Sequence, residues 1–495
     1  MLKTDIAGAP AEHLQKILRR LTPLQASGIA CLLLLLGNAP YLGNPPFWDD
    51  ILGLHRQALF LARHHFNFAE LMCSGDFWSG GAWIYKWNWP SVLYGGLYSF
   101  LPPVAVHFLG HILNIAVLAA SAGCVFKILR MNGISQAASL LWSLAMICEP
   151  VISAQGVSLG QEILLTGCFC GFLLAFSLNK VSMGFAFLLL GAWVKPAVVI
   201  PAAAFCAVAG VEFLKDRSRV NLAKLISGGL YLGSFAILFL LDSDGASGNV
   251  WKELPERIRD MWLHFPLLLI LAVLGLAGGT VRLIRDGWDR EYLLWLLWAA
   301  AFFAAYLLYS VPLPRYTAGI VPVCILLAAR SLPRTGYAAF VFLLAGIILQ
   351  GGAFHRPLPG HLRYSGEFLE RDRAFLQQVA LDQELCAKLE AECAAKPVVA
   401  KWPYVQMLAD PGYGYVKKGL EKVYCAGIVP KNMKNVKKYP DSELAKIQGV
   451  YYIFVCNSFE FFRDFGVPLA PRKGDALVWM PEKDRFQGTF LVYRR

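Results

Sequence analysis

Long apolar segments recur through residues 1–350, and they constrain the fold more than any other feature of the chain. A helix needs about 20 mostly apolar residues to cross a bilayer, because its backbone polar groups must be satisfied within the segment. About eleven such segments are predicted: 21–42, 104–126, 136–154, 162–178, 183–193, 197–213, 225–241, 263–281, 292–309, 316–329 and 337–350. The fifth, 183–193, and the tenth, 316–329, are short, so broken or re-entrant helices also fit them.

Composition supports a polytopic membrane protein. The 495 residues are 57% hydrophobic and only 16% charged, whereas soluble domains carry roughly a quarter charged residues. The first apolar run has no small-residue cleavage site and more runs follow it, so no secretory signal peptide is predicted. The net charge of +12 lies largely in short loops and the tail, which indicates topology and lipid-headgroup signals and argues against a nucleic-acid partner. No Walker loop, dinucleotide fingerprint or zinc-spaced Cys/His cluster appears.

Basic residues fall in alternate loops between the predicted spans. Cytoplasmic loops of membrane proteins carry an excess of Lys and Arg. With the N terminus in the cytoplasm beside Lys16, Arg19 and Arg20, an odd number of spans places the C terminus outside. The basic loop residues on the inner side are then Lys127, Arg130, Lys180, Lys215, Arg217, Arg219, Lys224, Arg282, Arg285, Arg290, Arg330 and Arg334.

Two segments lie outside the spans, both predicted on the outer side. Residues 49–103 form a long first loop rich in Trp, His and Gly. Within it, 55–66 is predicted as a short helix on the membrane surface, with Leu59, Phe60 and Leu61 facing lipid. The second segment is the tail, 352–495, in which charge rises. The predicted domains are therefore a membrane domain, 1–351, and a soluble outer domain, 352–495.

The tail pattern predicts a small α/β domain. A long helix is expected over 367–395, followed by strands at 398–402, 422–425, 450–456, 477–480 and 489–493. Four of the chain's twelve cysteines lie here: Cys386, Cys393, Cys425 and Cys456. An outer compartment permits disulfides, and buried free thiols are the alternative. The whole chain is thus expected to be an α-helical membrane protein with a C-terminal extracytoplasmic α/β domain.

Unusual polar residues gather at the predicted outer ends of the spans. Asp49 and Asp50 directly follow the first span, and charges beside lipid are costly enough to suggest a function. Each candidate has a structural alternative: a helix cap for an acid, a snorkelling side chain for a cation, and polar packing for a histidine. His107 and His111 share one helix face, as metal ligands do, but no third ligand is evident. The other candidates are Lys86, Glu162, Lys195, Arg315 and Tyr316.

The order of these motifs resembles the C-type (GT-C) glycosyltransferases. One span is followed by an outer acidic pair, a Pro-containing turn, Lys195-Pro196 in the middle of the chain, and Pro314-Arg315-Tyr316 before a late span. The sequence looks most like the bacterial branch related to protein O-mannosyltransferases and lipid A aminoarabinose transferases. The resemblance covers about residues 15–350. The basic-Pro-Pro turn of the family is replaced by Asn88-Trp89-Pro90, so its basic residue would be Lys86, displaced by two positions.

This resemblance implies an enzyme of the bacterial inner membrane. It would move a hexose or pentose from a polyprenyl-phosphate donor to an acceptor on the outer face, with inversion. Asp49 would be the general base on the acceptor hydroxyl. Asp50 would orient the acceptor or hold a divalent cation, for which Mg²⁺ or Mn²⁺ fits oxygen ligands, although two carboxylates alone leave metal dependence open. Arg315, with Lys86, Lys195 and Tyr316, would grip the donor phosphate.

Two other classes of function remain open at the level of sequence. A transporter or flippase of lipid-linked glycans would also carry charge within the membrane, but transporters usually contain two related halves, and none is seen here. A membrane assembly protein with an outer binding domain is the third reading. The donor sugar, the acceptor and the role of the tail are not encoded in any recognisable motif.

Overall fold

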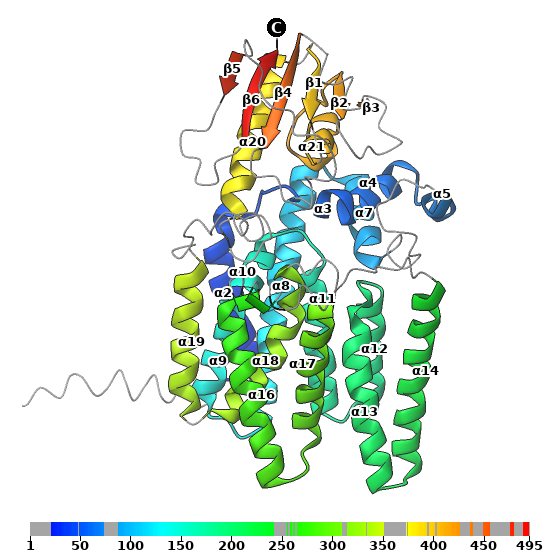
Figure 1. Ribbon diagram of the computed structural model, residues 1–495, viewed down its shortest axis with the longest axis vertical. Helices are drawn as coiled ribbons and strands as arrows, with labels where there is room; N and C mark the ends of the chain where they lie inside the picture. The colour runs from blue at the N-terminus through cyan, green and yellow to red at the C-terminus, as the bar shows by residue number, and fades with distance from the viewer. Residues whose placement is uncertain are drawn as a thin grey trace, which may run out of the picture. The chain divides into compact units, whose positions relative to one another are not determined.

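The fold is described from a computed structural model (Figure 1). The structure describes residues 21–47, 49–73, 88–241, 255, 258–259, 261–262, 265–308, 314–332, 334–350, 373, 375–393, 396–400, 403–425, 436–438, 449–455, 476–479 and 489–494. These residues form two compact units. We call the first the helical unit, Met1–Pro40, Ile112–Val157 and Gln161–Ala353, and the second the mixed unit, Tyr41–His111, Ser158–Gly160 and Phe354–Arg495.

Every predicted apolar segment coincides with helix in the structure. A helix that begins in the mixed unit, α8 (Pro103–Met131), continues into the helical unit. The other helical elements of that unit are α2 (Pro23–Asn38), α9 (Gln136–Ile147), α10 (Pro150–Val157), α11 (Glu162–Ser177), α12 (Val181–Ala192), η2 (Pro196–Val198), α13 (Val199–Lys215), α14 (Arg219–Leu241), α16 (Pro266–Asp286), α17 (Arg290–Leu308), η3 (Pro314–Ile320), α18 (Val321–Ser331) and α19 (Thr335–Gln350).

Helix length does not confirm the expected count of eleven crossings. Four of the described helical segments are long and apolar enough to span a bilayer: Pro23–Tyr41, Pro103–Met131, Pro196–Lys215 and Pro266–Asp286. A fifth is obtained if the bent pair α9 and α10 counts as one span. Helices α11, α12 and α19 are apolar but shorter than the roughly 20 residues that a straight crossing needs. The chain is an integral membrane protein whose number of crossings stays a prediction.

The predicted span 136–154 is not one straight helix. It bends by 59° between α9 and α10, because Pro150 cannot donate a backbone hydrogen bond and its ring clashes with the preceding turn. The side chain of Glu149 accepts a hydrogen bond from the Ile152 amide at 3.0 Å and so caps the new helix. The predicted span 316–329 likewise begins as the 3₁₀ segment η3 before it becomes α18.

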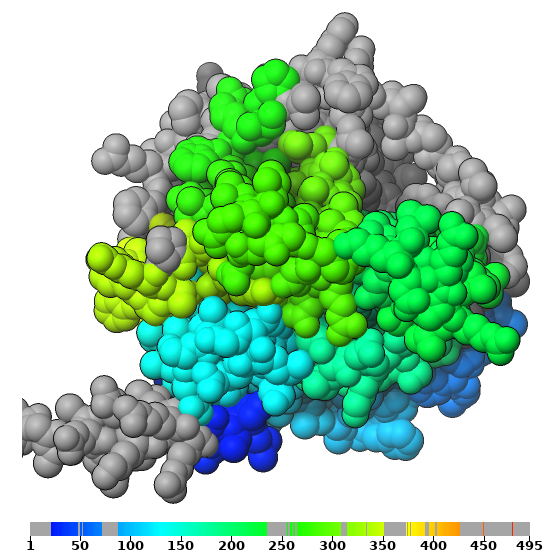
Figure 2. Space-filling view, turned by 90° about the horizontal axis from the view of Figure 1, so that it is seen from below, coloured from blue at the N-terminus to red at the C-terminus, as the bar shows by residue number. Residues whose placement is uncertain are grey.

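The basic loops meet at one end of the helical unit. The guanidinium of Arg330 pairs with Asp289 at 2.7 Å, and Arg282 donates to the Arg330 carbonyl at 2.8 Å. Asn132, after α8, donates to Glu291 at the start of α17 at 2.9 Å. These contacts join loops that lie far apart in the sequence. Figure 2 looks onto this end, where the turns α13–α14 and α16–α17 lie, and we call it the basic end.

The mixed unit combines the first loop with the tail. Its sheet has the order β3-β2-β1-β4-β6-β5; β1, β2, β3 and β4 pair in parallel, and β6 is antiparallel to β4 and β5. The remaining elements are η1 (Ala39–Tyr41), which reaches it from the helical unit, α3 (Asp49–Leu52), α4 (Leu54–Arg63), α5 (Phe68–Cys73), α7 (Trp89–Phe100), α20 (Phe375–Cys393), β1 (Val398–Ala400), α21 (Tyr404–Ala409), η4 (Pro411–Tyr413), β2 (Val423–Cys425), β3 (Val436–Lys438), β4 (Val450–Val455), β5 (Ala476–Trp479) and β6 (Thr489–Arg494).

The sequence pattern located five of the six described strands. The strand it missed, β3, reads Val-Lys-Lys, which is too short and too charged to show a strand pattern. Cys386 and Cys425 are buried free thiols, so neither forms a disulfide with another described cysteine. The tail as a separate domain stays a prediction, since its residues cluster with 41–111 in one unit.

The first-loop helix exists, but its predicted lipid-facing side was wrong. Leu59, on α4, is 6% exposed and packs in a core with Val405 and Leu408 of the tail. Leu61 is fully buried against Leu71, and Phe60 is half-buried and packs on the same two residues. The apolar face of a short amphipathic helix can pack into a protein core or lie on a membrane surface, and the sequence does not distinguish the two.

A bidentate ion pair joins the two parts of the mixed unit. Arg63, at the end of α4, donates to both carboxylate oxygens of Asp410, at 2.6 and 2.7 Å. Asp410 also accepts from the Gly412 amide at 2.8 Å, and the hydroxyl of Tyr415 donates to the Pro46 carbonyl at 3.0 Å. The fork geometry fixes orientation as well as adding free energy.

A buried acid makes the stability of the mixed unit depend on pH. Burial raises the pKa of Asp382, on α20, to about 7, although Tyr404 and Gln378 donate hydrogen bonds to its Oδ1. A folded-state pKa above the unfolded value favours folding below about pH 4, and this contribution is lost as pH rises to about 7. We expect Asp382→Asn, which retains Oδ1, to raise the thermal midpoint at pH 8 and to flatten its decline between pH 5 and 7. A midpoint with the same pH dependence as wild type would contradict this account.

Candidate functional site

Three charged residues predicted from the sequence converge in the helical unit. Glu162 is the first residue of α11, Lys195 stands between α12 and η2, and Arg315 lies in η3. Lys195 has an extended backbone (φ −154°, ψ 147°), as expected for a residue that precedes proline. The segment η3 lies directly on α11, because a Cβ added at Gly319 would meet the buried ring of Phe169 at 2.7 Å. The absence of a side chain there lets Arg315 approach the start of α11.

One carboxylate is shared by two cations in this cluster. Lys195 makes a short ion pair with Glu162, and Nε of Arg315 lies 3.7 Å from the same oxygen, Oε1. The side chains of Glu162 and Arg315 are only 5% and 9% exposed, whereas that of Lys195 is 21% exposed. Two positive charges against one negative charge leave a net charge of +1 in a largely buried setting.

Tyr316 completes the cluster from its aromatic side. The Lys195 Nζ atom lies 4.9 Å from the centre of the Tyr316 ring, and the Arg315 Cζ atom lies 5.5 Å from it. Cations at such distances are attracted to the ring face. We call Glu162, Lys195, Arg315 and Tyr316 the charged cluster. Its chemistry suits an anion: Arg presents a planar fork for phosphate oxygens, and Lys supplies a movable point charge.

The charged cluster and the basic end lie at opposite ends of α11. The cluster contains the first residue of this helix, and the basic loop residue Lys180 follows its last turn. Sixteen helical residues span about 24 Å at 1.5 Å per residue. The two polar sites are therefore separated along α11 by somewhat less than the roughly 30 Å of a bilayer's hydrocarbon core.

The acidic pair lies in the mixed unit, on α3. Asp49 begins this four-residue helix, and Asp50 follows it, 6% exposed, with its amide donating to the Phe47 carbonyl at 3.1 Å. The side chain of Asp49 and the whole of Lys86 lie outside the described residues. Among the residues that the structure describes, no three His, Cys, Asp or Glu side chains are grouped as metal ligands.

His107 and His111 are buried in the mixed unit as hydrogen-bonded groups. Nε2 of His111 donates to the Asn44 carbonyl at 3.0 Å. Nε2 of His107 lies 3.0 Å from the Tyr98 hydroxyl, which in turn lies 2.7 Å from Nδ1 of His55. Both predicted histidines therefore have the polar-packing role that the sequence left open beside metal binding.

The hydrogen-bond partners fix the tautomers in this His-Tyr-His chain. Burial lowers the pKa of His55 to about 3, so its ring is neutral at pH 7. Its Nε2 lies 3.3 Å from the Leu159 carbonyl, which only accepts, so Nε2 carries the proton. Nδ1 of His55 then accepts from Tyr98, and the Tyr98 oxygen accepts from His107. The sequence offered no signal for His55, which lies in an ordinary amphipathic helix.

Comparison with known proteins gives a likeness to solved structures. No family model and no curated protein matches the chain. One similar structure is the crystal structure of ArnT from Cupriavidus metallidurans bound to undecaprenyl phosphate. The likeness covers 94% of this chain and 97% of the ArnT chain, with 14% sequence identity and a TM-score of 0.46. At this identity and TM-score the likeness assigns no ligand and no residue role to this chain.

Proposed function

We propose that this protein is a membrane glycosyltransferase that uses a polyprenyl-phosphate-linked sugar and holds the donor phosphate at the charged cluster. The observation that carries the proposal is the convergence of Lys195 and Arg315 on the buried carboxylate of Glu162. A net positive charge in a partly dry site attracts a phosphate more strongly than the same charges would in water. The position at one end of apolar helices suits a phosphate whose lipid tail lies in the bilayer.

The chemistry follows from the charge that develops at the donor. When the glycosidic bond to phosphate breaks, the leaving group gains negative charge, and a fixed guanidinium stabilises it. Lys195, which reaches solvent, approaches the same phosphate from the side of the Tyr316 ring. Glu162 holds the two cations beside one another and oriented until the donor binds, which reduces the reorganisation required during the reaction.

The acceptor hydroxyl requires a base, and we assign this role to Asp49 with Asp50 beside it. The proposal rests on the position of the pair directly after the first apolar segment. Transfer would invert the anomeric centre, because the base activates the acceptor for direct displacement of the phosphate. By the positive-inside rule the basic end faces the cytoplasm, so the charged cluster would face the periplasm. A divalent cation at the acidic pair is a separate proposal, tested below with a chelator.

Replacing Asp49 tests this function directly. We expect Asp49→Asn to reduce transfer of label from a polyprenyl-phosphate sugar pool by at least about 100-fold, since general-base catalysis contributes 10²–10⁴-fold. Asp50→Asn is the matched variant, and a smaller loss is expected for an orienting residue. Wild-type membranes are assayed with and without chelator, and the labelled product identifies the acceptor. An Asp49→Asn enzyme with full activity would disprove the base assignment, and no transfer by folded wild type across several donor sugars would disprove the function.

A further inference from the structure

A pocket lies at the basic end of the helical unit, remote from the charged cluster. It lies where α11 ends and α12 begins. Its walls are of two kinds. One is apolar and aromatic, with Phe172, Phe176 and Phe205 among its residues, and the other carries three cations, Lys180, Lys224 and Arg290.

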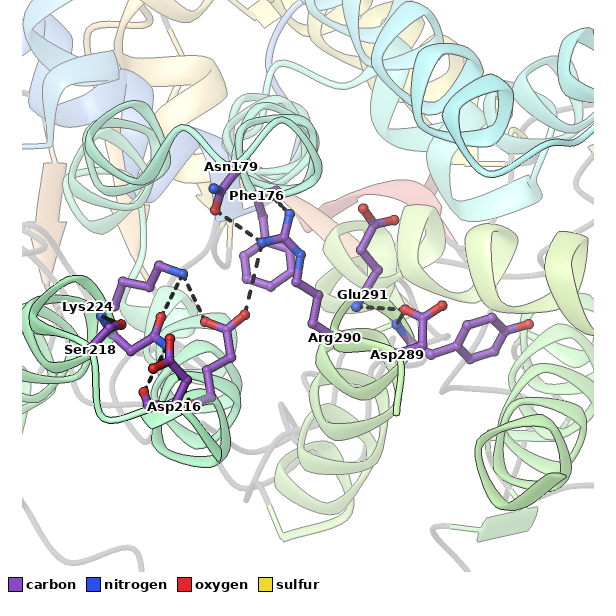
Figure 3. A network of polar contacts seen from close by, with 11 residues as sticks. Phe176, Asn179, Asp216, Ser218, Lys224, Asp289, Arg290 and Glu291 are labelled. Atoms are coloured by element: carbon purple, nitrogen blue, oxygen red, sulfur yellow. Dashed lines mark hydrogen bonds and ion pairs between the residues drawn. The ribbon is translucent and has the colours of Figure 1, made fainter. Parts of the chain in front are cut away.

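Two of the three cations share one carboxylate (Figure 3). Lys224 contacts Glu212 at 2.9 Å, and Arg290 lies 4.0 Å from the same side chain. Arg290 also donates to the side chain of Asn179 at 3.1 Å and to the Phe176 carbonyl at 3.4 Å. Lys180 is exposed, and its side chain makes no hydrogen bond or ion pair with any residue that the structure describes. The three cations of the pocket and the carboxylate of Glu212 together therefore carry a net charge of +2.

The local backbone directs Lys180 to the mouth of the pocket. Asn179 adopts a left-handed conformation with φ 56°, which asparagine tolerates better than most residues. The turn is closed by the amide of Lys180, which donates to the Ala175 carbonyl at 2.8 Å. Val181, the first residue of α12, also lines the pocket, so a helix N-terminus adds positive potential at the same mouth.

The aromatic wall determines which anion fits. Phe172 and Phe205 are almost fully buried and form the base of this wall, with their rings edge to face. Phe176 and Phe185 are half-buried and also line the pocket, so they are the rings that a ligand can reach. A small inorganic anion gains nothing from such a wall, whereas a lipid acyl chain does. Basic pockets between membrane helices at the cytoplasmic side are suited to anionic lipid headgroups. We propose that this pocket binds an anionic glycerophospholipid, with its phosphate between Lys180, Lys224 and Arg290 and the upper part of an acyl chain along Phe176 and Phe185.

The test measures lipid binding by the full-length protein purified in detergent. Native mass spectrometry counts bound phosphatidylglycerol and phosphatidylcholine, and thermal midpoints are titrated with each lipid and with glycerol phosphate. Wild type is expected to bind one phosphatidylglycerol in preference to phosphatidylcholine. Lys180→Gln should weaken phosphatidylglycerol about fivefold, the effect of one basic residue near a membrane surface. Arg217→Gln is the control, because Arg217 is exposed at the same end and does not line the pocket.

Three outcomes would overturn the proposal. Equal binding of phosphatidylglycerol and phosphatidylcholine would show that the net negative charge of the lipid headgroup does not determine binding. Equal affinity of Lys180→Gln and wild type would place the lipid elsewhere. Protection by glycerol phosphate as strong as that by phosphatidylglycerol would show a site for small phosphates. Lys180 is exposed and its side chain makes no hydrogen bond or ion pair with the described residues, so Lys180→Gln should leave the folded state intact.

Discussion

Arg315→Ala is expected to reduce sugar transfer by about 10²–10³-fold, the loss seen when one preorganised donor to a developing negative charge is removed. Arg315 is 8% exposed and lies beside Glu162 and Tyr316, so water cannot readily replace it. Donor affinity should fall more than acceptor affinity. The measurement is transfer by purified enzyme with donor and acceptor concentrations varied independently.

Arg330→Ala is the matched control for this variant. Arg330 is also a nearly buried arginine, with a side chain 9% exposed and paired with Asp289 at 2.7 Å, but it lies at the basic end. Loss of a buried arginine should destabilise the two variants to a similar degree, whereas only Arg315→Ala should lose transfer per folded molecule. Arg315→Lys retains the charge without the fork, and an intermediate activity is expected. Equal losses of donor and acceptor affinity in Arg315→Ala would contradict a phosphate-binding role.

Glu162→Gln is expected to destabilise the folded protein by about 3 kcal/mol, because it leaves two cations without their shared carboxylate. This is the low end of the range for breaking a buried pair, since Lys195 retains access to solvent. The measurement is equilibrium unfolding in mixed micelles. A polyprenyl phosphate should restore more stability to Glu162→Gln than to wild type, because the ligand then supplies the missing negative charge.

A second substitution separates charge from packing. Adding Lys195→Gln to Glu162→Gln removes the excess positive charge, so the double variant should recover part of the lost stability. If the destabilisation came from packing at the start of α11, the second change would add to the first. A Glu162→Gln protein as stable as wild type would show that the cluster is not held together by its charges.

The apolar pattern predicted the positions of the helices because lipid and a helical core demand the same continuous hydrophobicity. The same pattern hid the bend at Pro150, since the residues on both sides of it are apolar. It also assigned Leu59 to lipid, because the tail residues that bury it, Val405 and Leu408, lie about 350 positions away in the sequence. Leu61 was assigned to lipid as well, although Leu71 of the same loop buries it. Contacts between distant segments are fixed by the fold, which a single amphipathic helix does not encode.

The candidate site could likewise be predicted only in part from the sequence. The cost of charge near lipid marked Glu162, Lys195 and Arg315 individually. Their convergence on one carboxylate depends on the approach of η3 to α11 at Gly319, which the sequence does not reveal. The spacing of His107 and His111 identified them as candidates in the sequence. The hydrogen-bonded chain from His107 through the Tyr98 hydroxyl to His55 could not be predicted from the sequence. Asp49 and Lys86 stay predictions, since their side chains lie outside the described residues.

The most direct test of the charged cluster is binding of a polyprenyl phosphate compared with the corresponding polyprenol. Wild type and Lys195→Gln are measured in nanodiscs that contain excess anionic phospholipid, so that the basic-end pocket is occupied. Lys215→Gln is the control, because its ammonium also lies over an aromatic ring, 4.0 Å from the centre of Trp288, at the basic end. Wild type should prefer the phosphate, and Lys195→Gln should lose about tenfold or more of that preference, the value of one charged hydrogen bond. Equal binding of phosphate and alcohol, or equal losses in both lysine variants, would contradict the central claim.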